Sequence, residues 1–343
     1  MKKSLILSAV LASSVFAMSD AKLLQSAKDA GLMPLPTTQK AIEAELSKSG
    51  VKANVYSKEK AELGKKLYFD PRLSKSSLIS CNTCHNLGLG GVDGIPASTG
   101  HKWTPNPHHV NAPSVYNAIL NTAQFWDGRA SDLVDQAKGP LTAEPEMAST
   151  PELIESRLKS IPQYVKEFNK IYKDGVSFDN AADAIATFER TLITPSRFDK
   201  FLNGDLNALS KEEKAGLGVF IDKGCIACHT GAILGGTMQA FEVAGKYEFA
   251  NVGDFKGDAN GMVRTPTLRN VEYTAPYFHN GAIWTLNDAI KAMGSVQLGI
   301  NISDSEAKSI ITFLKSLTGQ MPQIIYPILP PSTDETPRPV LDY

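Results

Sequence analysis

The chain has few cysteines, no excess of either charge and no long apolar stretch. Its 343 residues include four cysteines, and 35 basic side chains nearly balance 36 acidic ones, for a formal charge of −1. A balanced charge argues against nucleic acid as a partner. No stretch approaches the roughly 18 consecutive apolar residues that a membrane-spanning helix needs. Alternating strand patterns are also few, which favours a mainly α fold.

The four cysteines are all used in two copies of one motif. The copies are Cys81, Cys84 and His85, and Cys225, Cys228 and His229. This C-x-x-C-H pattern is the attachment signature of c-type haem, in which two thiols bond the porphyrin and the histidine ligates the iron. The sequence therefore predicts two covalently bound haem c groups. A zinc site built from both motifs and structural disulfides remain as alternatives, but a disulfide would leave both histidines unexplained.

Residues 1–21 have the pattern of a signal peptide. Lys2 and Lys3 precede an apolar run, residues 5–17, that has the length of a signal-peptide core. Small residues predict cleavage after about residue 17 or after residue 21. Because haem c is attached outside the cytoplasm, the signal and the haem motifs support each other and predict a periplasmic protein. A retained N-terminal anchor is the alternative.

A faint internal repeat surrounds the haem motifs. Residues 64–70 precede the first motif and residues 216–222 the second, and each reads as the end of an amphipathic helix. This duplication indicates two cytochrome c-like haem domains, residues 22–196 and 197–320. Further helical patterns occupy residues 151–172, interrupted at Pro162, residues 180–192 and residues 304–317. The tail, residues 321–343, holds six prolines and is expected to pack on the surface as an extended segment.

Longer strings outside the haem motifs point to a family. They are residues 89–91 (LGG), 101–103 (HKW), 111–113 (NAP), 124–129 (QFWDGR), 136–140 (QAKGP), 146–147 (EM), 192–195 (LITP), 274–279 (TAPYFH) and 293–294 (MG). With these strings the chain closely resembles the bacterial di-haem cytochrome c peroxidases over nearly its whole mature length. The resemblance implies a homodimer that reduces H2O2 with electrons from a small periplasmic donor such as cytochrome c.

The resemblance also implies the sixth ligand of each iron. Met293 would ligate the second iron, and a thioether ligand raises the reduction potential, which suits the receipt of electrons. His101 would ligate the first iron and leave it when the second haem is reduced, so that peroxide can bind. The segment before His101 has five glycines between residues 87 and 101, which makes such a movement plausible. From spacing alone, Met293 reads more readily as a core residue of the helix over residues 286–293.

Two further side chains are implied to act on peroxide. Glu146 would move the proton from the bound peroxide to the leaving oxygen as a general acid–base, and Gln136 would hold the peroxide by a hydrogen bond. Without the resemblance, Glu146 reads as one of two solvated loop acids. Trp126 corresponds to a tryptophan between the haems, where it either relays electrons or packs. His279 belongs to a matching string but has no predicted role.

A calcium site is implied between the two domains. Asn111, Thr274 and Pro276 correspond to its ligands and offer one side-chain amide and two backbone carbonyls. Such oxygen donors suit a hard cation, and their lack of charge predicts weak binding.

Two other functions compete with peroxide reduction. A di-haem oxidase of a protein side chain has the same scaffold, but it resembles this chain less because its second haem carries a tyrosine ligand. A di-haem electron-transfer protein without peroxidase activity would keep His101 on the iron permanently.

Overall fold

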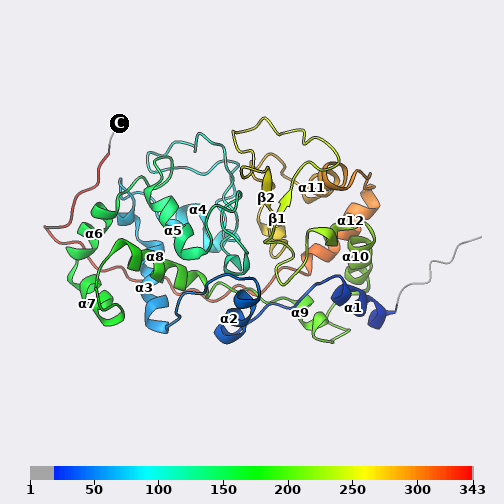
Figure 1. The fold of residues 1–343 in the computed structure, drawn as a ribbon, viewed down its shortest axis with the longest axis horizontal. Coiled ribbons are helices and arrows are strands. Elements are labelled where there is room, and N and C mark those ends of the chain that lie inside the picture. The colour runs from blue at the N-terminus through cyan, green and yellow to red at the C-terminus, as the bar shows by residue number, and fades with distance from the viewer. Residues whose placement is uncertain (1–18, 342–343) are drawn as a thin grey trace, which may run out of the picture.

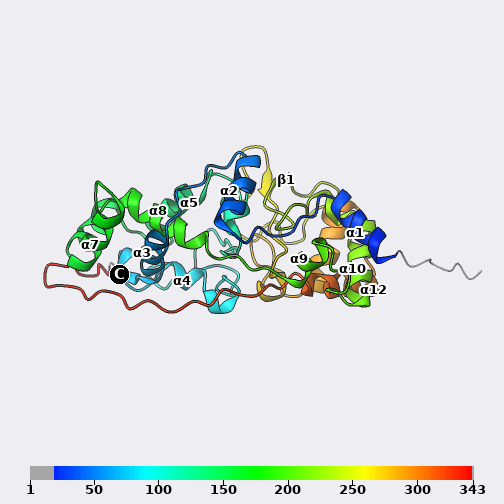
Figure 2. The same cartoon turned by 90° about the horizontal axis from the view of Figure 1, so that it is seen from below.

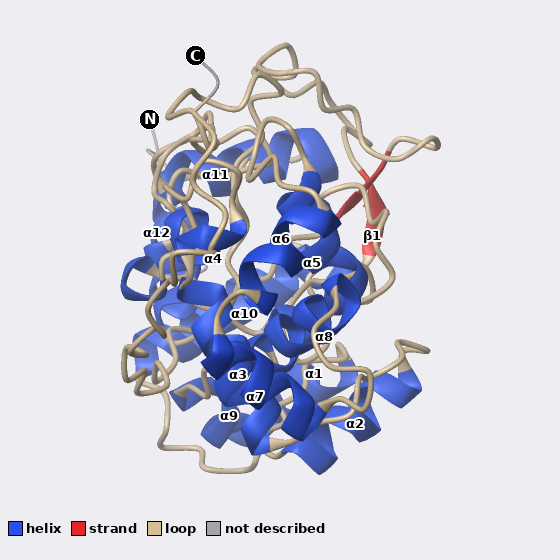
Figure 3. Cartoon of the chain, turned by 90° about the vertical axis from the view of Figure 1, so that its left-hand side faces the viewer, coloured by secondary structure: helices blue, strands red, loops and turns tan. Residues whose placement is uncertain are grey.

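The computed structural model describes residues 19–341, which form an elongated molecule of helices and long loops (Figure 1). The predicted apolar signal core and the cleavage position after residue 17 lie outside the described residues. Within them, the strands are β1 (Met238–Ala240) and β2 (Met262–Arg264), which pair antiparallel (Figure 3). The expected mainly α class is therefore confirmed. Across residues 19–341, we find no helix with the length and apolar character to span a membrane.

The helices of the described residues follow the predicted patterns closely. Most begin directly after a serine, threonine or aspartate whose side chain accepts a hydrogen bond from a backbone N–H of the first turn. They are α1 (Asp20–Asp29), α2 (Gln39–Lys48), α3 (Lys58–Phe69), α4 (Cys81–Cys84), α5 (Leu133–Thr142), α6 (Pro151–Lys159), α7 (Pro162–Ile171), α8 (Phe178–Glu189), α9 (Arg197–Leu202), α10 (Lys211–Asp222), α11 (Leu286–Met293) and α12 (Asp304–Lys315).

Each haem motif follows one helix of a tightly crossed pair. α3, which precedes the first motif, packs across α8, and α10, which precedes the second motif, packs across α12. A Cβ atom on Gly64 would lie 1.8 Å from the carbonyl oxygen of Ala184, and one on Gly216 would lie 2.1 Å from that of Ser309. Only glycine permits this close approach of the two backbones. The repeat that the sequence suggests is thus a repeat of helix crossings.

The two halves have separate hydrophobic cores. Each end of the chain packs against the half to which it does not belong in sequence. The first core includes Tyr68 of α3 and Phe188 of α8, and the second includes Phe220 of α10 and Phe313 of α12. α1 contributes Leu23 to the second core, although it precedes the first haem motif. The predicted domain boundary after residue 196 stays a prediction. Residues 20–32 pack in the core of the second half, although they belong to the first half in sequence.

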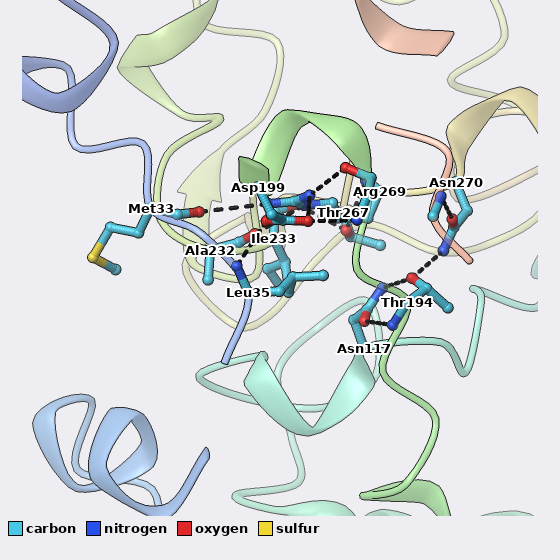
Figure 4. A network of polar contacts seen from close by, with 12 residues as sticks. Met33, Leu35, Asn117, Thr194, Asp199, Ala232, Ile233, Thr267, Arg269 and Asn270 are labelled. Carbon is cyan, nitrogen blue, oxygen red and sulfur yellow. Dashed lines mark hydrogen bonds and ion pairs between the residues drawn. The ribbon is translucent and has the colours of Figure 1, made fainter. Parts of the chain in front are cut away.

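A buried ion pair ties the N-terminal segment to the second half (Figure 4). The guanidinium of Arg269 donates to Asp199 at 2.8 and 2.9 Å. The same carboxylate accepts from the backbone N–H of Leu35 at 2.8 Å, and Arg269 also donates to the carbonyl oxygen of Ala232 at 2.9 Å. This network therefore joins residues just after α1 to the loop that follows the second haem motif.

The C-terminal tail crosses in the opposite direction. Residues 319–341 contain no helix or strand and run from α12 along the molecule to the first half (Figure 2). There the guanidinium of Arg157 donates to the carbonyl oxygens of Pro337 and Arg338 at 3.3 and 3.1 Å. The backbone N–H of Val340 donates to the carbonyl oxygen of Lys75 at 3.0 Å. Up to residue 341 the tail has no helix or strand and contacts the first half, while its role as a separate surface segment stays a prediction.

The repeat extends into the loops between the helices. Gln124 pairs with Ala130, and Tyr277 with Ile283, in isolated antiparallel β-bridges that close turns of equal length. The second residue of each segment, Phe125 or Phe278, has a positive φ, of 66° and 70°. With the same offset, Asn117 corresponds to Asn270. Both residues have a left-handed backbone conformation, and both side-chain amides donate to Thr194 Oγ1 (Figure 4). In this alignment Trp126 corresponds to His279. The two halves thus share the same loop pattern over these residues.

Candidate active site

The structure has one cavity at each haem motif. The first cavity, of about 300 Å³, is lined by Cys84 and His85, and the second, of about 220 Å³, by Cys225, Cys228 and His229. A water molecule occupies about 30 Å³ of liquid, so each cavity accepts a much larger group. None of the four cysteines forms a disulfide. Because the two motifs line different cavities, they do not form the single zinc site considered from the sequence.

Both motif histidines are held by a hydrogen bond at Nδ1, which leaves Nε2 as the nitrogen that can ligate an iron. His85 Nδ1 lies 3.0 Å from the carbonyl oxygen of Pro113, and His229 Nδ1 lies 2.9 Å from that of Leu234. With Nδ1 as the donor, Nε2 keeps the lone pair that a metal needs. Burial lowers the pKa of both imidazoles, which favours the neutral form. The residues present therefore fit two c-type haems.

The first cavity brings the two predicted peroxide residues together. Gln136 on α5 and Glu146 in the turn after α5 both line it with His85. Burial raises the pKa of the Glu146 carboxyl, while Arg129 and His108 oppose the shift. A raised pKa brings a carboxyl closer to the range in which it can both accept and return a proton. The structure thus brings together the two residues expected to act on peroxide, whose roles stay predictions.

His101 lies apart from the lining of the first cavity. Its side chain is buried, and its backbone N–H donates to the carbonyl oxygen of Glu146 at 2.7 Å. A Cβ atom on the preceding Gly100 would lie 2.3 Å from the carbonyl oxygen of Pro145. The loop that carries His101 therefore packs tightly on the segment that carries Glu146. The predicted ligation of the first iron by His101 stays a prediction.

Met293 lines the second cavity with His229. It is the last residue of α11, and the lining includes the ring of His279, which is enclosed by aromatic side chains. Burial lowers the pKa of His279 to about 4, so this imidazole is neutral. The structure thus brings the predicted thioether ligand to the same cavity as the second haem motif.

The repeat shows a difference at the position of Met293 that the sequence analysis missed. α5 and α11 follow corresponding turns and begin at Leu133 and Leu286. Counting along both helices aligns Met293 with Pro140, and Pro140 lines the first cavity. A proline side chain has no ligand atom, so the first cavity has no counterpart of the thioether. Aligning residues 124–140 with residues 277–293 reveals this from sequence, once the common turn is recognised.

Trp126 lies in the wall that the two cavities share. It is 7 % exposed, and its indole Nε1–H donates to the carbonyl oxygen of Asn111 at 2.8 Å. Its ring meets that of His279 edge-on, with 6.4 Å between the ring centres. The residues that line both cavities are Asn111, Ala112, Pro113, Ser114, Trp126 and Arg264. This wall, which also holds the buried Arg264, lies between the two predicted haems.

The three predicted calcium ligands lie together beside this wall. Asn111, Thr274 and Pro276 all line the second cavity, and Asn111 Nδ2 donates to the carbonyl oxygen of Pro276 at 2.8 Å. Asn111 comes from the first half and the other two from the second. The donor set is compatible with a hard cation and includes no carboxylate.

Glu189 is an acid of the first cavity that the sequence analysis missed. It ends α8 and is 5 % exposed, and its Oε2 has no hydrogen-bond partner among the described residues. Burial raises its pKa to about 8. Its apolar helical surroundings in the sequence, Phe188 and Leu192, indicate burial but not a cavity.

Stability should depend on pH through Glu189. Between the ordinary pKa of about 4.5 and the folded value of about 8, the folded protein holds a proton that the unfolded chain releases. The free energy of unfolding therefore falls as pH rises from 5 to 8, by up to a few kcal/mol from this group. Replacing Glu189 with glutamine should flatten that fall in denaturant titrations of the haem-containing protein. Equal falls in both proteins would contradict the raised pKa.

The fold and its two cavities define a c-type cytochrome with two predicted haem sites, and Glu146 and Gln136 line the cavity of the first. Residues 58–207 match the family of di-haem cytochrome c peroxidases, and residues 213–318 match cytochrome c. The chain is 49% identical over 299 residues to cytochrome c551 peroxidase of Pseudomonas aeruginosa, covering 82% of this chain and 85% of the relative. It is also 49% identical over 287 residues to cytochrome c551 peroxidase of Nitrosomonas europaea, covering 81% and 85%.

A solved structure has the same fold. It is a MauG-like protein associated with microbial copper homeostasis, with a TM-score of 0.67 at 25% identity, covering 78% of this chain and 91% of that one. The chain belongs to the di-haem cytochrome c peroxidase family. The resemblance, the mainly helical cytochrome c-like fold and the peroxidase class of enzyme expected from the sequence are thereby confirmed.

Proposed function

We propose that the protein reduces hydrogen peroxide in the periplasm with electrons from a small c-type cytochrome or a similar donor. The overall reaction is H2O2 + 2 e− + 2 H+ → 2 H2O. The observation that carries the proposal is the asymmetry of the two cavities. The first has Glu146, Gln136 and a proline where the second has Met293. The first is thus equipped for proton transfer at an iron without a thioether ligand, and the second for electron transfer.

Glu146 and Gln136 divide the work on peroxide. When bound beside His85 and His229, the two haems would supply the electrons that break the O–O bond. The Glu146 carboxylate takes the proton of the bound peroxide and returns it to the leaving oxygen, which departs as water. Gln136 orients the peroxide through its amide and carries no titratable proton. Burial, which raises the pKa of Glu146, makes its carboxylate a stronger base for the first of these transfers.

His101 controls access to the first iron. Its present position, off the cavity and bonded to the Glu146 backbone, supports a state in which peroxide reaches the site. Because Gly100 packs against the Pro145 carbonyl, movement of His101 to the iron requires the Glu146 segment to move as well. Ligation of the first iron by His101 and displacement of Glu146 would then occur together. Reduction of the second haem is the proposed trigger for opening.

The proposed electron path and calcium site lie at the shared wall or directly beside it. Met293 raises the potential of the second haem, which receives electrons, and Trp126 lies between the cavities either as relay or as packing. A Ca2+ ion held by Asn111, Thr274 and Pro276 would fix the wall between the halves. The homodimer rests on the family resemblance and stays a prediction.

Export with cleavage after about residue 17 is supported by the start of α1. The Ser19 side chain accepts a hydrogen bond from the Lys22 N–H at 3.4 Å, and Asp20 forms an ion pair with Lys214 at 2.5 Å. Cleavage after residue 21 would remove both. N-terminal sequencing of the exported protein distinguishes the two positions.

Replacing Pro140 with methionine tests the asymmetry of the cavities. The variant offers the first iron the ligand that Met293 offers the second, so we expect a low-spin first haem and loss of peroxide turnover. Visible and EPR spectra report the spin state, and Pro140→Leu is the matched control without a sulfur atom. Loss of turnover in both variants with unchanged spectra would show that proline is needed for another reason.

The proposed function is tested by steady-state peroxide consumption with a reduced small c-type cytochrome. Sustained oxidation of two donor molecules per H2O2 is the expected result. A protein that exchanges electrons with the donor but leaves peroxide unconsumed would be an electron-transfer protein, and the proposal would be wrong.

A further inference from the structure

Arg264 is a buried cation without a protein counter-charge. It ends β2 and is 3 % exposed, and no carboxylate of the described residues lies within ion-pair distance of it. Its Nε donates to the carbonyl oxygen of Phe125 at 2.9 Å, and its Nη1 to Asn121 Oδ1 at 3.1 Å. Both acceptors are neutral, and Nη2 donates no hydrogen bond within residues 19–341. Buried arginines are rare unless they are paired, so this one indicates an anionic ligand.

The surroundings of Arg264 point to where that anion lies. Arg264 lines both cavities, with its guanidinium carbon 5.8 Å from the centre of the Trp126 ring. The lining of the second cavity contains no other lysine or arginine and no aspartate or glutamate. The first cavity also has Arg129, but that side chain is 56% exposed and already paired with Asp127 at 2.9 Å. Arg264 is therefore the cation available to an anion inside the second cavity.

Comparison of the two repeats shows that the charge of Arg264 is not needed to form its loop. Asn111 corresponds to Arg264, and the two positions make matching backbone bonds: Asn111 N–H donates to the His279 carbonyl oxygen at 2.8 Å, and Arg264 N–H to that of Trp126 at 2.8 Å. The first copy of the loop is thus built with a neutral side chain at this position. The fold of the loop does not demand a buried charge, so the cation in the second copy needs a different explanation.

We propose that the Arg264 guanidinium binds haem propionate carboxylates at the wall between the two cavities, chiefly those of the second haem. This inference rests on the proposed binding of two haems. Each haem carries two carboxylates, and a guanidinium binds a carboxylate through two parallel N–H donors. The pair supplies the missing counter-charge to Arg264 and fixes the haem next to Trp126. Its positive charge also favours the reduced form of the nearby iron, since reduction adds one negative charge. Arg264 is thus a positioning and potential-setting residue.

The test replaces Arg264 with glutamine and with lysine in the haem-containing protein. Spectroelectrochemical titration of Arg264→Gln should show the second haem shifted about tenfold toward the oxidised form, which is about 59 mV for one electron. Arg264→Lys, which retains the charge, should recover most of that shift. Arg129→Gln is the control, because it removes a solvent-exposed, already paired cation and should leave the second haem's potential unchanged.

A second measurement does not depend on the folding of a variant. Infrared difference spectra of oxidised and reduced wild-type protein, with 13C in the propionate carboxyls, should show ionised propionates at the second haem from pH 5 to 8. Protonated propionates on the second haem at neutral pH would overturn the proposal, as would an unchanged potential in Arg264→Gln. Those results in a protein that still consumes peroxide would leave the proposed function standing, whereas absence of peroxide consumption in wild type would remove that function instead.

Discussion

Replacing Glu146 with glutamine is expected to lower peroxide turnover by a factor of about 10²–10⁴, the usual contribution of a positioned general acid–base. The amide keeps the size and one hydrogen-bonding oxygen of the carboxyl but cannot take up or return a proton. Glu146 lines the first cavity, and the proposed haem ligand His101 lies outside that lining. The visible spectra of both haems should therefore remain those of the wild type.

Glu144 provides the matched control for Glu146. It lies in the same turn, its side chain is 78% exposed, and its contact with Lys102 is long at 3.8 Å. Glu144→Gln should keep full turnover under the same reduced donor and peroxide concentrations. Full turnover in Glu146→Gln would remove this residue from the mechanism, and equal losses in both variants would point to disruption of the turn.

Replacing Met293 with leucine should lower the reduction potential of the second haem by on the order of tenths of a volt. Leucine fills similar space at the end of α11 but has no thioether, and axial ligands move haem potentials over a range of about 0.8 V. A lower potential makes the second haem a poor electron acceptor, so turnover with a cytochrome donor should fall as well. Potentiometric titration followed by visible spectra measures the change.

The control for Met293 is a methionine outside both cavities. Met33 lies between α1 and α2 and is 36% exposed, so Met33→Leu should leave both potentials unchanged. An unaltered second potential in Met293→Leu would mean that another group ligates that iron. A change in the first haem alone would mean that the assignment of the two haems is reversed.

Local signals in the sequence predict the helices and the two haem motifs. The C-x-x-C-H motifs bring three cofactor-binding side chains together within five residues, so no knowledge of the fold is needed to find them. The break at Pro162 separates α6 from α7 because a proline lacks the N–H that a helix interior uses. Such features depend on neighbouring residues and are therefore readable from the chain.

Several features that depend on distant parts of the chain were not predicted, either from local signals or from the family resemblance. α1 packs in the second core although it precedes the first motif, because its apolar face is complementary to α9 and α10. Glu189 and Arg264 read as ordinary charged residues until the fold buries them beside the cavities. The correspondence of Pro140 with Met293 becomes visible only when the matching turns around Phe125 and Phe278 are superposed.

Stepwise reduction of the purified protein, with Ca2+ present and followed by visible and EPR spectra, tests the division of labour between the two haems most directly. We predict that reduction of the high-potential haem produces a high-spin signal from the other, and that peroxide is then consumed rapidly. Two haems that stay low-spin through the first reduction and leave peroxide unconsumed would contradict the assignment of the first cavity as the site of peroxide reduction.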